Sequence, residues 1–264
     1  MTRGVAVLVS SCDHFSDAWA PFFYFWKRYW PDCPYPVYLL SNYGRYEDPA
    51  VTSLAVGREK SWADNLLRAL EQMECQTLIY FQEDYFLNRP VETEKLARIV
   101  TYFEDVEAVY CGLFPVPAPE ADYQCNGLGI GRVPEGAPMR ASLQAALWNR
   151  RALMDLVRSG ESAWDMEKLG TERSRTQLFL RVESVDQAPL GYYATAIKRG
   201  CWEWGAVKLC LRHGIRLDLS QRPLRSRIPK EAKKQKWVRR WKAWRNRWWP
   251  TRPVVVPLTA SDGR

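Results

Sequence analysis

The stretch "LIYFQEDYFL" (residues 78–87) places two carboxylates inside an apolar run. Four apolar residues lead into Gln82-Glu83-Asp84, and apolar residues resume at Tyr85. An unpaired carboxylate buried in a strand costs several kcal/mol or more. Either the strand ends at these residues and the acids face a cleft, or a cation neutralises them. Residues 77–81 are therefore predicted to form a buried strand, and the elements around it decide the fold.

Strands and helices are predicted to alternate on both sides of this stretch. Short β-branched or apolar runs predict strands at 4–11 ("GVAVLVSS"), 36–42, 52–57 and 108–113. Amphipathic runs predict helices at 17–30, 61–73 and 92–105. Asp17 is expected to cap the first of these helices, and Ser61 with Asp64 forms the capping pattern of the second. This order indicates an α/β fold with a mostly parallel sheet flanked by helices.

The second half of the chain is less regular. Residues 114–141 are rich in Pro and Gly and are expected to be irregular, with a short strand as an open alternative, and their "GLGIG" lacks the spacing of a dinucleotide fingerprint. A strand is predicted at 142–150, where Asn149 can cap a following helix, and a further helix is predicted at 162–180.

The charge of the chain is concentrated near its C-terminus. Residues 222–252 hold thirteen Lys or Arg and one acid, so this segment carries +12; because the whole chain carries +8, the remainder sums to −4. Four tryptophans lie within roughly 60° of one helical face: Trp237, Trp241, Trp244 and Trp248. Residues 221–250 therefore predict a basic amphipathic helix, and 230–250 suit an anionic membrane surface. A helix folded back on the domain is the alternative, nucleic acid fits less well, and 251–264 are expected to be loose.

Cysteine and histidine usage narrows the functional classes. The seven cysteines include no C-x-x-C pair, which favours free thiols in a reducing cytosol over a zinc site. Two histidines argue against a His-rich metal site and a Ser-His-Asp triad. No apolar run of about 18 residues occurs, so no transmembrane helix is predicted.

Polar residues follow several predicted strands. In a parallel sheet, ligands bind beyond the carboxyl ends of the strands. The residues at such ends are Ser10, Ser11, Asp13, Asn42, Glu83 and Asp84. An acidic pair there suits Mg²⁺ or Mn²⁺ against a diphosphate, where the ion stabilises a leaving phosphate. A helix cap or a salt bridge to Arg is the structural alternative.

A second acidic cluster lies in "SAWDMEK" (162–168). On a helix, Asp165 and Glu167 point roughly 200° apart, so both cannot face one small site. One of them can be a general base placed by the helix. The alternative is that both lie on a solvated helix face.

Several stretches together resemble bacterial glycosyltransferases of the GT-A fold that build surface polysaccharides. They are "VLVSSCDHFSDAWAPFFYFWKRYWPDCPYPVYLLSN", "SWADNLLRALEQ", "LIYFQEDYFL", "SLQAALWNRRALMDLV", "ESAWDMEKLGTERS" and "AIKRGCW", spread over roughly 4–215. The resemblance implies a GT-A-like catalytic domain at 1–220, with a donor half at 1–113 and an acceptor half at 114–220. It implies transfer of a sugar from a nucleotide-sugar donor, typically UDP-linked, to a hydroxyl of a glycan or lipid-linked glycan.

The resemblance also assigns roles to residues. The donor site would comprise Ser10, Ser11, Asp13, Asn42, Ser61, Trp62, Asn65, Glu83 and Asp84. The metal-binding D-x-D motif corresponds to Gln82-Glu83-Asp84, so Asp84 would be the ligand for Mg²⁺ or Mn²⁺, and Gln82 in the first position leaves metal dependence open.

On the acceptor side, Glu167 is favoured over Asp165 as the base of an inverting displacement. Trp164 would stack on a sugar, Gln144 would hydrogen-bond the acceptor, and Lys198 or Arg199 would meet the diphosphate. In the structural alternative, Trp164 belongs to the core and Gln144 is an ordinary strand residue.

Two other functional classes remain open. One is a non-catalytic module that binds a nucleotide sugar or glycan and is anchored by the basic tail. The other is a nucleotidyltransferase on a similar scaffold. The expected location is cytoplasmic, on the inner face of the cytoplasmic membrane.

Overall fold

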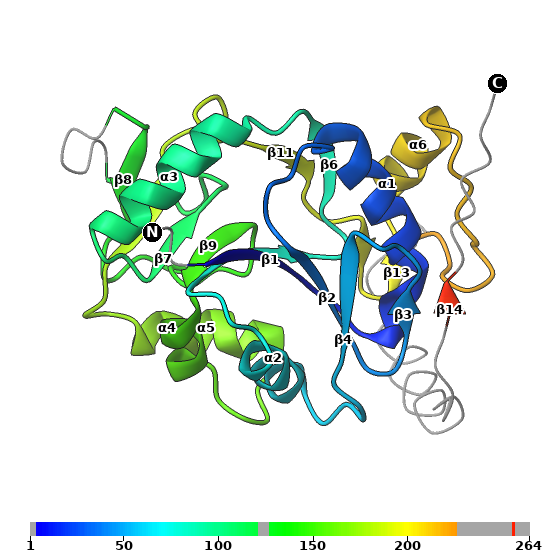
Figure 1. Cartoon of the computed structure of the whole chain (residues 1–264), viewed down its shortest axis with the longest axis horizontal. Helices are drawn as coiled ribbons and strands as arrows, with labels where there is room; N and C mark the ends of the chain where they lie inside the picture. Colours follow the sequence, from blue (N-terminus) through cyan, green and yellow to red (C-terminus); the bar gives the residue numbers. More distant parts are fainter. Residues whose placement is uncertain (1–3, 121–126, 226–254, 257–264) are drawn as a thin grey trace, which may run out of the picture.

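The computed structural model describes residues 4–120, 127–225 and 255–256. Of the predicted basic segment at 221–250, residues 226–250 lie outside the described residues, and the described residues 221–225 are not helical. The main sheet has eight strands in the order β4-β2-β1-β5-β9-β7-β10-β8 (Figure 1). Its strands are β1 Val5–Ser10, β2 Val37–Ser41, β4 Val51–Ala55, β5 Thr77–Gln82, β7 Tyr110–Gly112, β8 Ile130–Arg132, β9 Ala146–Asn149 and β10 Phe179–Val182.

The sheet is mostly parallel, as predicted. Strands β4, β2, β1 and β5 pair in parallel, and so do β7 and β10. Strand β9 runs antiparallel to both β5 and β7, and β8 runs antiparallel to β10. The α/β fold implied by the alternation of elements is therefore confirmed.

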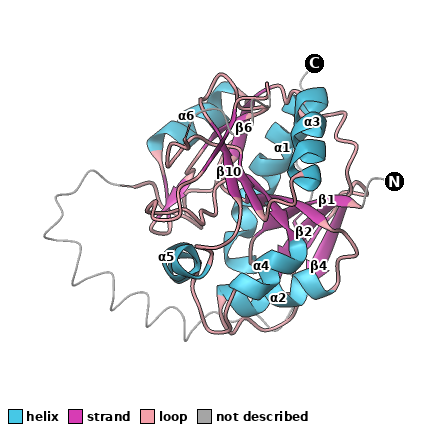
Figure 2. Cartoon of the chain, turned by 90° about the vertical axis from the view of Figure 1, so that its left-hand side faces the viewer, coloured by secondary structure: helices cyan, strands magenta, loops and turns pink. Residues whose placement is uncertain are grey.

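Helices cover both faces of this sheet (Figure 2). They are α1 Trp19–Tyr29, α2 Trp62–Glu71, α3 Thr93–Asp105, α4 Arg150–Leu156, α5 Ala163–Arg173 and α6 Trp204–Arg212, with a 3₁₀ helix at Asp13–Ala18. Alternate residues of β1 supply the two cores: Val7 and Val9 pack with α1 and α3, whereas Ala6 and Leu8 pack with α2 and α4. No described helix has the length and apolar character needed to cross a membrane.

Three short strand pairs complete the described chain. Strand β6 (Phe86–Arg89) pairs antiparallel with β11 (Gly191–Tyr193), and β12 (Ile197–Lys198) forms a hairpin with β13 (Cys201–Trp202). Strand β14 (Val255–Val256) pairs in parallel with β3 (Arg45–Tyr46). The C-terminal stretch expected to be loose thus contains one short strand.

Two predicted helices differ from those observed. The run at 17–30 begins as the 3₁₀ helix, and Asp17 does not cap α1 because its carboxylate pairs with Arg222. The run at 162–180 stops at Arg173, and β10 follows as a strand buried along its whole length. Short apolar runs fit a helix or a buried strand equally well, which explains the second error. Ser61 and Asn149 cap α2 and α4 as predicted.

The arrangement of β1 and β5 positions the site. The chain passes from β1 through α1 to β2 on one side, and later returns through α2 to β5 on the other side of β1. Ser10 and Gln82 are in register at the carboxyl ends of these two strands. An α/β sheet opens a ligand-binding crevice where its strand order reverses in this way.

Candidate active site

Strand β5 ends in a tight turn that carries both acids. The Tyr85 N–H donates to the Gln82 carbonyl oxygen at 3.1 Å, and Glu83 and Asp84 occupy the turn. The two acids are 8% and 7% exposed. The strand therefore stops at Gln82, and the acids lie at its exit rather than within a continuous strand.

Asp84 is tied to the segment that enters the β12–β13 hairpin. Its Oδ2 accepts the Ile197 N–H at 3.2 Å, and its carbonyl oxygen accepts the Ala196 N–H at 3.0 Å. Burial raises the pKa of Asp84 to about 6, against the lowering effect of these hydrogen bonds. Asp84 thus combines a titratable carboxyl with a structural link across 113 residues of sequence.

Glu83 has a different environment from Asp84. Burial, and then the charge of Asp84, raises the pKa of Glu83 well above its usual range, whereas Arg222 opposes the shift. Arg222 is 3% exposed, binds both oxygens of Asp17 at 2.8 and 2.9 Å, and lies 4.6 Å over the Phe15 ring. Arg222 opens the segment predicted as the tail, but it belongs to the folded domain.

A cavity of about 340 Å³ lies beside this turn. The cavity is lined by residues from both the predicted donor half (1–113) and the predicted acceptor half (114–220). They include Gln82, Asp84, Gln144, Trp164, Glu167 and Arg199. Trp164 is 78% exposed, so it stands at the surface and is not the core residue of the structural alternative. The cavity therefore brings one carboxylate from each acidic cluster to a single space with an exposed aromatic ring.

Helix α5 presents Glu167 to this cavity. The Glu167 Oε1 accepts the Leu143 N–H at 2.8 Å and lies 3.4 Å from the Ser142 hydroxyl. Burial raises the pKa of Glu167, and these two hydrogen bonds oppose the shift. A carboxylate held in place with a raised pKa is suited to accept a proton near neutral pH.

Asp165 takes a structural role on the same helix. It forms a capping box with Ser162, and the Ser162 hydrogen bonds lower the pKa of Asp165. Asp165 does not line the cavity. The structure thus separates the two candidate bases, and Glu167 is the one that faces the cavity.

Tyr85 and Gln144, which line the cavity, belong to a network of hydroxyl and amide groups. The Tyr192 hydroxyl donates to Gln144 Oε1 at 2.8 Å, and Gln144 Nε2 donates to the Tyr85 oxygen at 3.4 Å. Tyr85 in turn donates to the Leu143 carbonyl oxygen at 3.3 Å. Tyr85 is not predicted from the sequence, because a tyrosine in an apolar run has the pattern of a core residue, and Tyr192 has no local sequence signal.

The polar residues at the ends of β1 and β2 meet as predicted, but they bind the backbone. Asp13 accepts the backbone N–H groups of Asn42, Tyr43 and Gly44 at 3.0 to 3.2 Å. Asn42 accepts the Asp13 N–H and donates to the Gly57 carbonyl oxygen, each at 3.1 Å. These side chains fix the two loops beside the crevice.

The other predicted donor residues also lie outside the cavity. Ser11 accepts the Trp19 indole N–H at 2.7 Å, Ser61 caps α2, and Ser10 is buried. Trp62 packs against the apolar cluster under α2. Asn65 is buried, and its Oδ1 has no hydrogen-bond partner within the described residues. Of the predicted donor set, Asp84 lines the cavity.

The described residues do not form a complete metal site by themselves. Within the described ranges, no three His, Cys, Asp or Glu side chains gather to hold an ion. One carboxylate oxygen of Asp84 already accepts the Ile197 N–H. Gln82, which lines the cavity beside Asp84, carries a neutral amide in place of a second carboxylate. Mg²⁺ requires close to six oxygen ligands, so a single partly engaged carboxylate leaves nearly all of them to substrate and water.

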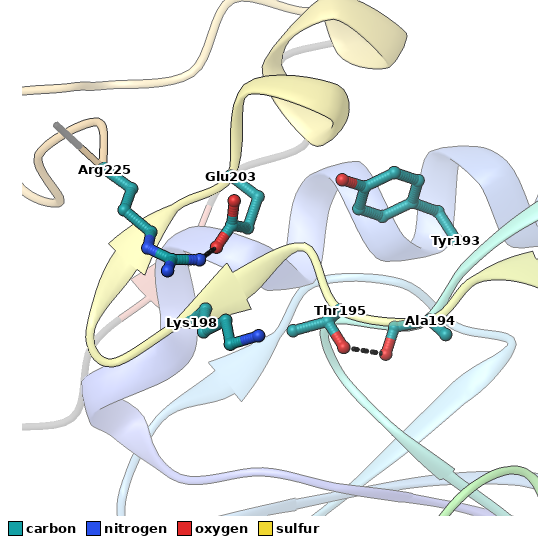
Figure 3. Close-up of a pocket in the computed structure, with 6 residues that line it drawn as sticks. All are labelled: Tyr193, Ala194, Thr195, Lys198, Glu203 and Arg225. Atoms are coloured by element: carbon teal, nitrogen blue, oxygen red, sulfur yellow. Dashed lines mark hydrogen bonds and ion pairs between the residues drawn. The ribbon is translucent and has the colours of Figure 1, made fainter. Parts of the chain in front are cut away.

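A second, more open cavity of about 230 Å³ adjoins the first (Figure 3). It is lined by Tyr193, Ala194, Thr195, Lys198, Glu203 and Arg225. Thr195 and Lys198 line both cavities. Arg225 pairs with Glu203, and the Lys198 side chain lies between that pair and Thr195.

Comparisons with known proteins give structural matches alone. No protein-family model matches the chain, and no curated protein does. The solved structures that match include S. aureus TarS 1-349 in complex with UDP-GlcNAc, at 12% identity and a TM-score of 0.48 over 75% of this chain and 59% of that one. The same TarS fragment in complex with UDP matches at 11% identity and a TM-score of 0.46, over 73% of this chain and 60% of that one. The structure titled S. aureus TarS matches at 12% identity and a TM-score of 0.44, over 73% of this chain and 36% of that one.

The chain therefore spans at most 60% of the length of these TarS chains. All three TM-scores lie below 0.5. At this level of similarity, the function has to be argued from the site itself.

Proposed function

We propose that this protein is a glycosyltransferase that moves a sugar from a nucleotide-sugar donor to an acceptor hydroxyl. The observation that carries the proposal is that Asp84, at the exit of β5, and Glu167, on α5, line one cavity. The cavity lies beside the carboxyl end of a central strand, where α/β sheets bind ligands. The sequence resemblance described above supplies the donor class, a UDP-linked sugar.

Glu167 is the general base of this proposal. An acceptor hydroxyl in the cavity would give its proton to the Glu167 carboxylate as its oxygen attacks C1 of the sugar. The bond from C1 to the donor diphosphate breaks, and the nucleoside diphosphate leaves with the electron pair. Attack opposite the leaving group inverts the configuration at C1. The Leu143 N–H fixes the position of the carboxylate during these steps.

Trp164 and Gln144 would hold the acceptor. The exposed Trp164 ring offers an apolar face to a sugar ring at the mouth of the cavity. Gln144 is held by Tyr85 and Tyr192, so its amide presents a fixed orientation. Fixed polar groups and an aromatic face are a common combination in small-molecule sites.

The basic segment at 230–250 would place the enzyme at an anionic membrane surface, on the cytoplasmic face. Its sequence, with a tryptophan stripe among lysines and arginines, supports this part of the proposal. A lipid-linked glycan acceptor would then be concentrated near the cavity. Liposome flotation tests the claim: the full chain is expected to float with anionic vesicles and a chain lacking 230–250 is not. If the full chain stays at the bottom, the membrane proposal is wrong.

Release of UDP from a panel of UDP-sugars tests the enzymatic proposal. UDP-GlcNAc is the first donor to try, with glycan acceptors. Glu167→Gln is expected to lower kcat by about 10²–10⁴-fold, the usual contribution of a general base. Glu172→Gln, an exposed glutamate of the same helix, is the matched control and should behave as wild type. Binding of UDP-sugars without turnover would instead favour the non-catalytic module, and pyrophosphate release would favour a nucleotidyltransferase.

A further inference from the structure

The β12–β13 hairpin brings two cations to the cavity. Lys198 and Arg199 are exposed, and both line the cavity that Asp84 and Glu167 face. Neither forms an ion pair with any carboxylate in the described part of the chain. Glu203, the acid that lines the adjoining cavity with Lys198, is paired with Arg225 instead (Figure 3). Within the described residues, no carboxylate is therefore paired with either of these two charges.

The hairpin is fixed rather than loosely attached. Arg199 and Gly200 form its two-residue connection with φ values of +54° and +73°, as in the turns that best match the twist of paired strands. Trp202 is fully buried, and its backbone N–H donates to the Pro223 carbonyl oxygen at 3.0 Å. The hairpin therefore fixes the backbone positions of Lys198 and Arg199.

Asp84 anchors the other end of this hairpin. The Ile197 N–H, one residue before Lys198, donates to Asp84 Oδ2, and the Ala196 N–H donates to the Asp84 carbonyl oxygen. This bond gives Asp84 a reason to be buried at the exit of β5 that does not involve a metal. It also connects the acidic turn directly to the cationic hairpin.

We infer that the donor diphosphate is neutralised by Lys198 and Arg199 rather than by a divalent ion held on Asp84. In this account Asp84 is a positioning residue, which fixes the hairpin. The inference rests on the proposed function. When the bond from C1 to the diphosphate breaks, the electron pair stays on the phosphate oxygen, and the new negative charge faces the two cations. Arg and Lys are effective partners for phosphate groups.

UDP binding and UDP release in EDTA, with and without added Mn²⁺, test the inference. The wild-type chain is expected to bind UDP and to turn over in EDTA, with less than a threefold gain from Mn²⁺. The double variant Lys198→Ala/Arg199→Ala should raise the Kd of UDP by about 10- to 100-fold, since two charge-assisted contacts are lost. Lys208→Ala/Arg212→Ala, which removes two exposed cations of α6, is the charge-matched control and should bind as wild type.

Variants of Asp84 separate positioning from metal ligation. Asp84→Asn keeps an oxygen that can accept the Ile197 N–H, so it should recover most of the UDP affinity that Asp84→Ala loses. A metal ligand would instead be impaired in both variants, because an amide is a poor ligand for a hard cation.

The outcomes distinguish this inference from the proposed function. Turnover that stops in EDTA and returns with Mn²⁺ would overturn the inference and leave the glycosyltransferase proposal intact. Unchanged UDP affinity in the Lys198/Arg199 variant would also overturn it. Failure of the wild-type chain to bind UDP under either condition would overturn both.

Discussion

The two acidic clusters of this protein, Glu83-Asp84 and Asp165/Glu167, look alike in sequence but differ in the folded chain. The first pair sits in a turn, where burial raises the pKa of both carboxyls. The second pair is divided by its helix: Asp165 is exposed with a lowered pKa, and Glu167 is half-buried with a raised one. In each pair, one member lines the cavity.

This difference shows that the environment, rather than the residue type, assigns the roles. Asp165 has its hydrogen bonds satisfied by the capping box and stabilises a helix end. Glu167 faces a cavity and can exchange a proton. In the turn, Asp84 holds the cationic hairpin, and the charge of Arg222 opposes the raised pKa of Glu83 as it does that of Asp84. Groups whose pKa values are moved apart by their surroundings can serve different functions.

The largest expected effect is on the free energy of unfolding, and it follows from the loss of the Arg222 charge near the buried turn. Arg222→Ala leaves the nearly buried carboxylate of Asp17 without its partner, and removes the cation that opposes the raised pKa of Glu83. Loss of one partner of a buried ion pair costs about 3–5 kcal/mol in the free energy of unfolding. Chemical denaturation measures this loss. Arg225→Ala, which breaks the more exposed pair with Glu203, should cost about 1 kcal/mol or less.

Equal losses in the two arginine variants would contradict this prediction. They would mean that Arg222 contributes no more to the free energy of unfolding than the partly exposed Arg225 does. The charge of Arg222 would then not stabilise the buried turn.

A smaller effect depends on pH. The pKa of Asp84 is raised from an unfolded value near 3.9 to about 6, so its stabilising contribution is fully present below about pH 4 and is lost as the pH rises through 6. Asp84→Asn removes this titration. At pH 8 the free energy of unfolding of the variant should therefore be about 2–3 kcal/mol larger than that of wild type, which makes the variant more stable. This gain in stability should vanish near pH 4. Urea unfolding at both values measures the difference.

Asp186→Asn, an exposed aspartate, serves as the control and should show no such pH-dependent gain. A gain for Asp84→Asn that is the same at pH 4 and pH 8 would show that the Asp84 carboxyl is not destabilised by burial.

The sequence predicted the fold well where its signals were local. The capping residues Ser61 and Asn149 and the alternation of strands with helices identified most elements of the parallel part of the sheet. The helix predicted at 162–180 ran into the first two residues of β10, Phe179 and Leu180, because a short apolar run has no period that separates strand from helix. The role of Asp17 was also missed, since its partner Arg222 is 205 residues away.

The candidate site was predictable only in part, for the same reason. The acids at the exit of β5 and the base on α5 were found because chain position and residue chemistry coincide there. The polar residues after β1 and β2 were expected to bind the donor, but Asp13 and Asn42 use their side chains on backbone groups of the neighbouring loops. Whether a polar side chain meets a ligand or the backbone depends on tertiary contacts that sequence spacing does not contain.

The most direct test of the account is the pH dependence of kcat for UDP release in wild type, Asp165→Asn and Glu167→Gln. The account predicts that wild-type kcat rises with pH through the raised pKa of Glu167, because the base must be deprotonated. Asp165→Asn should keep this profile, and Glu167→Gln should lose about 10²–10⁴-fold in kcat together with the rise. Loss of activity in Asp165→Asn, with a wild-type profile in Glu167→Gln, would contradict it.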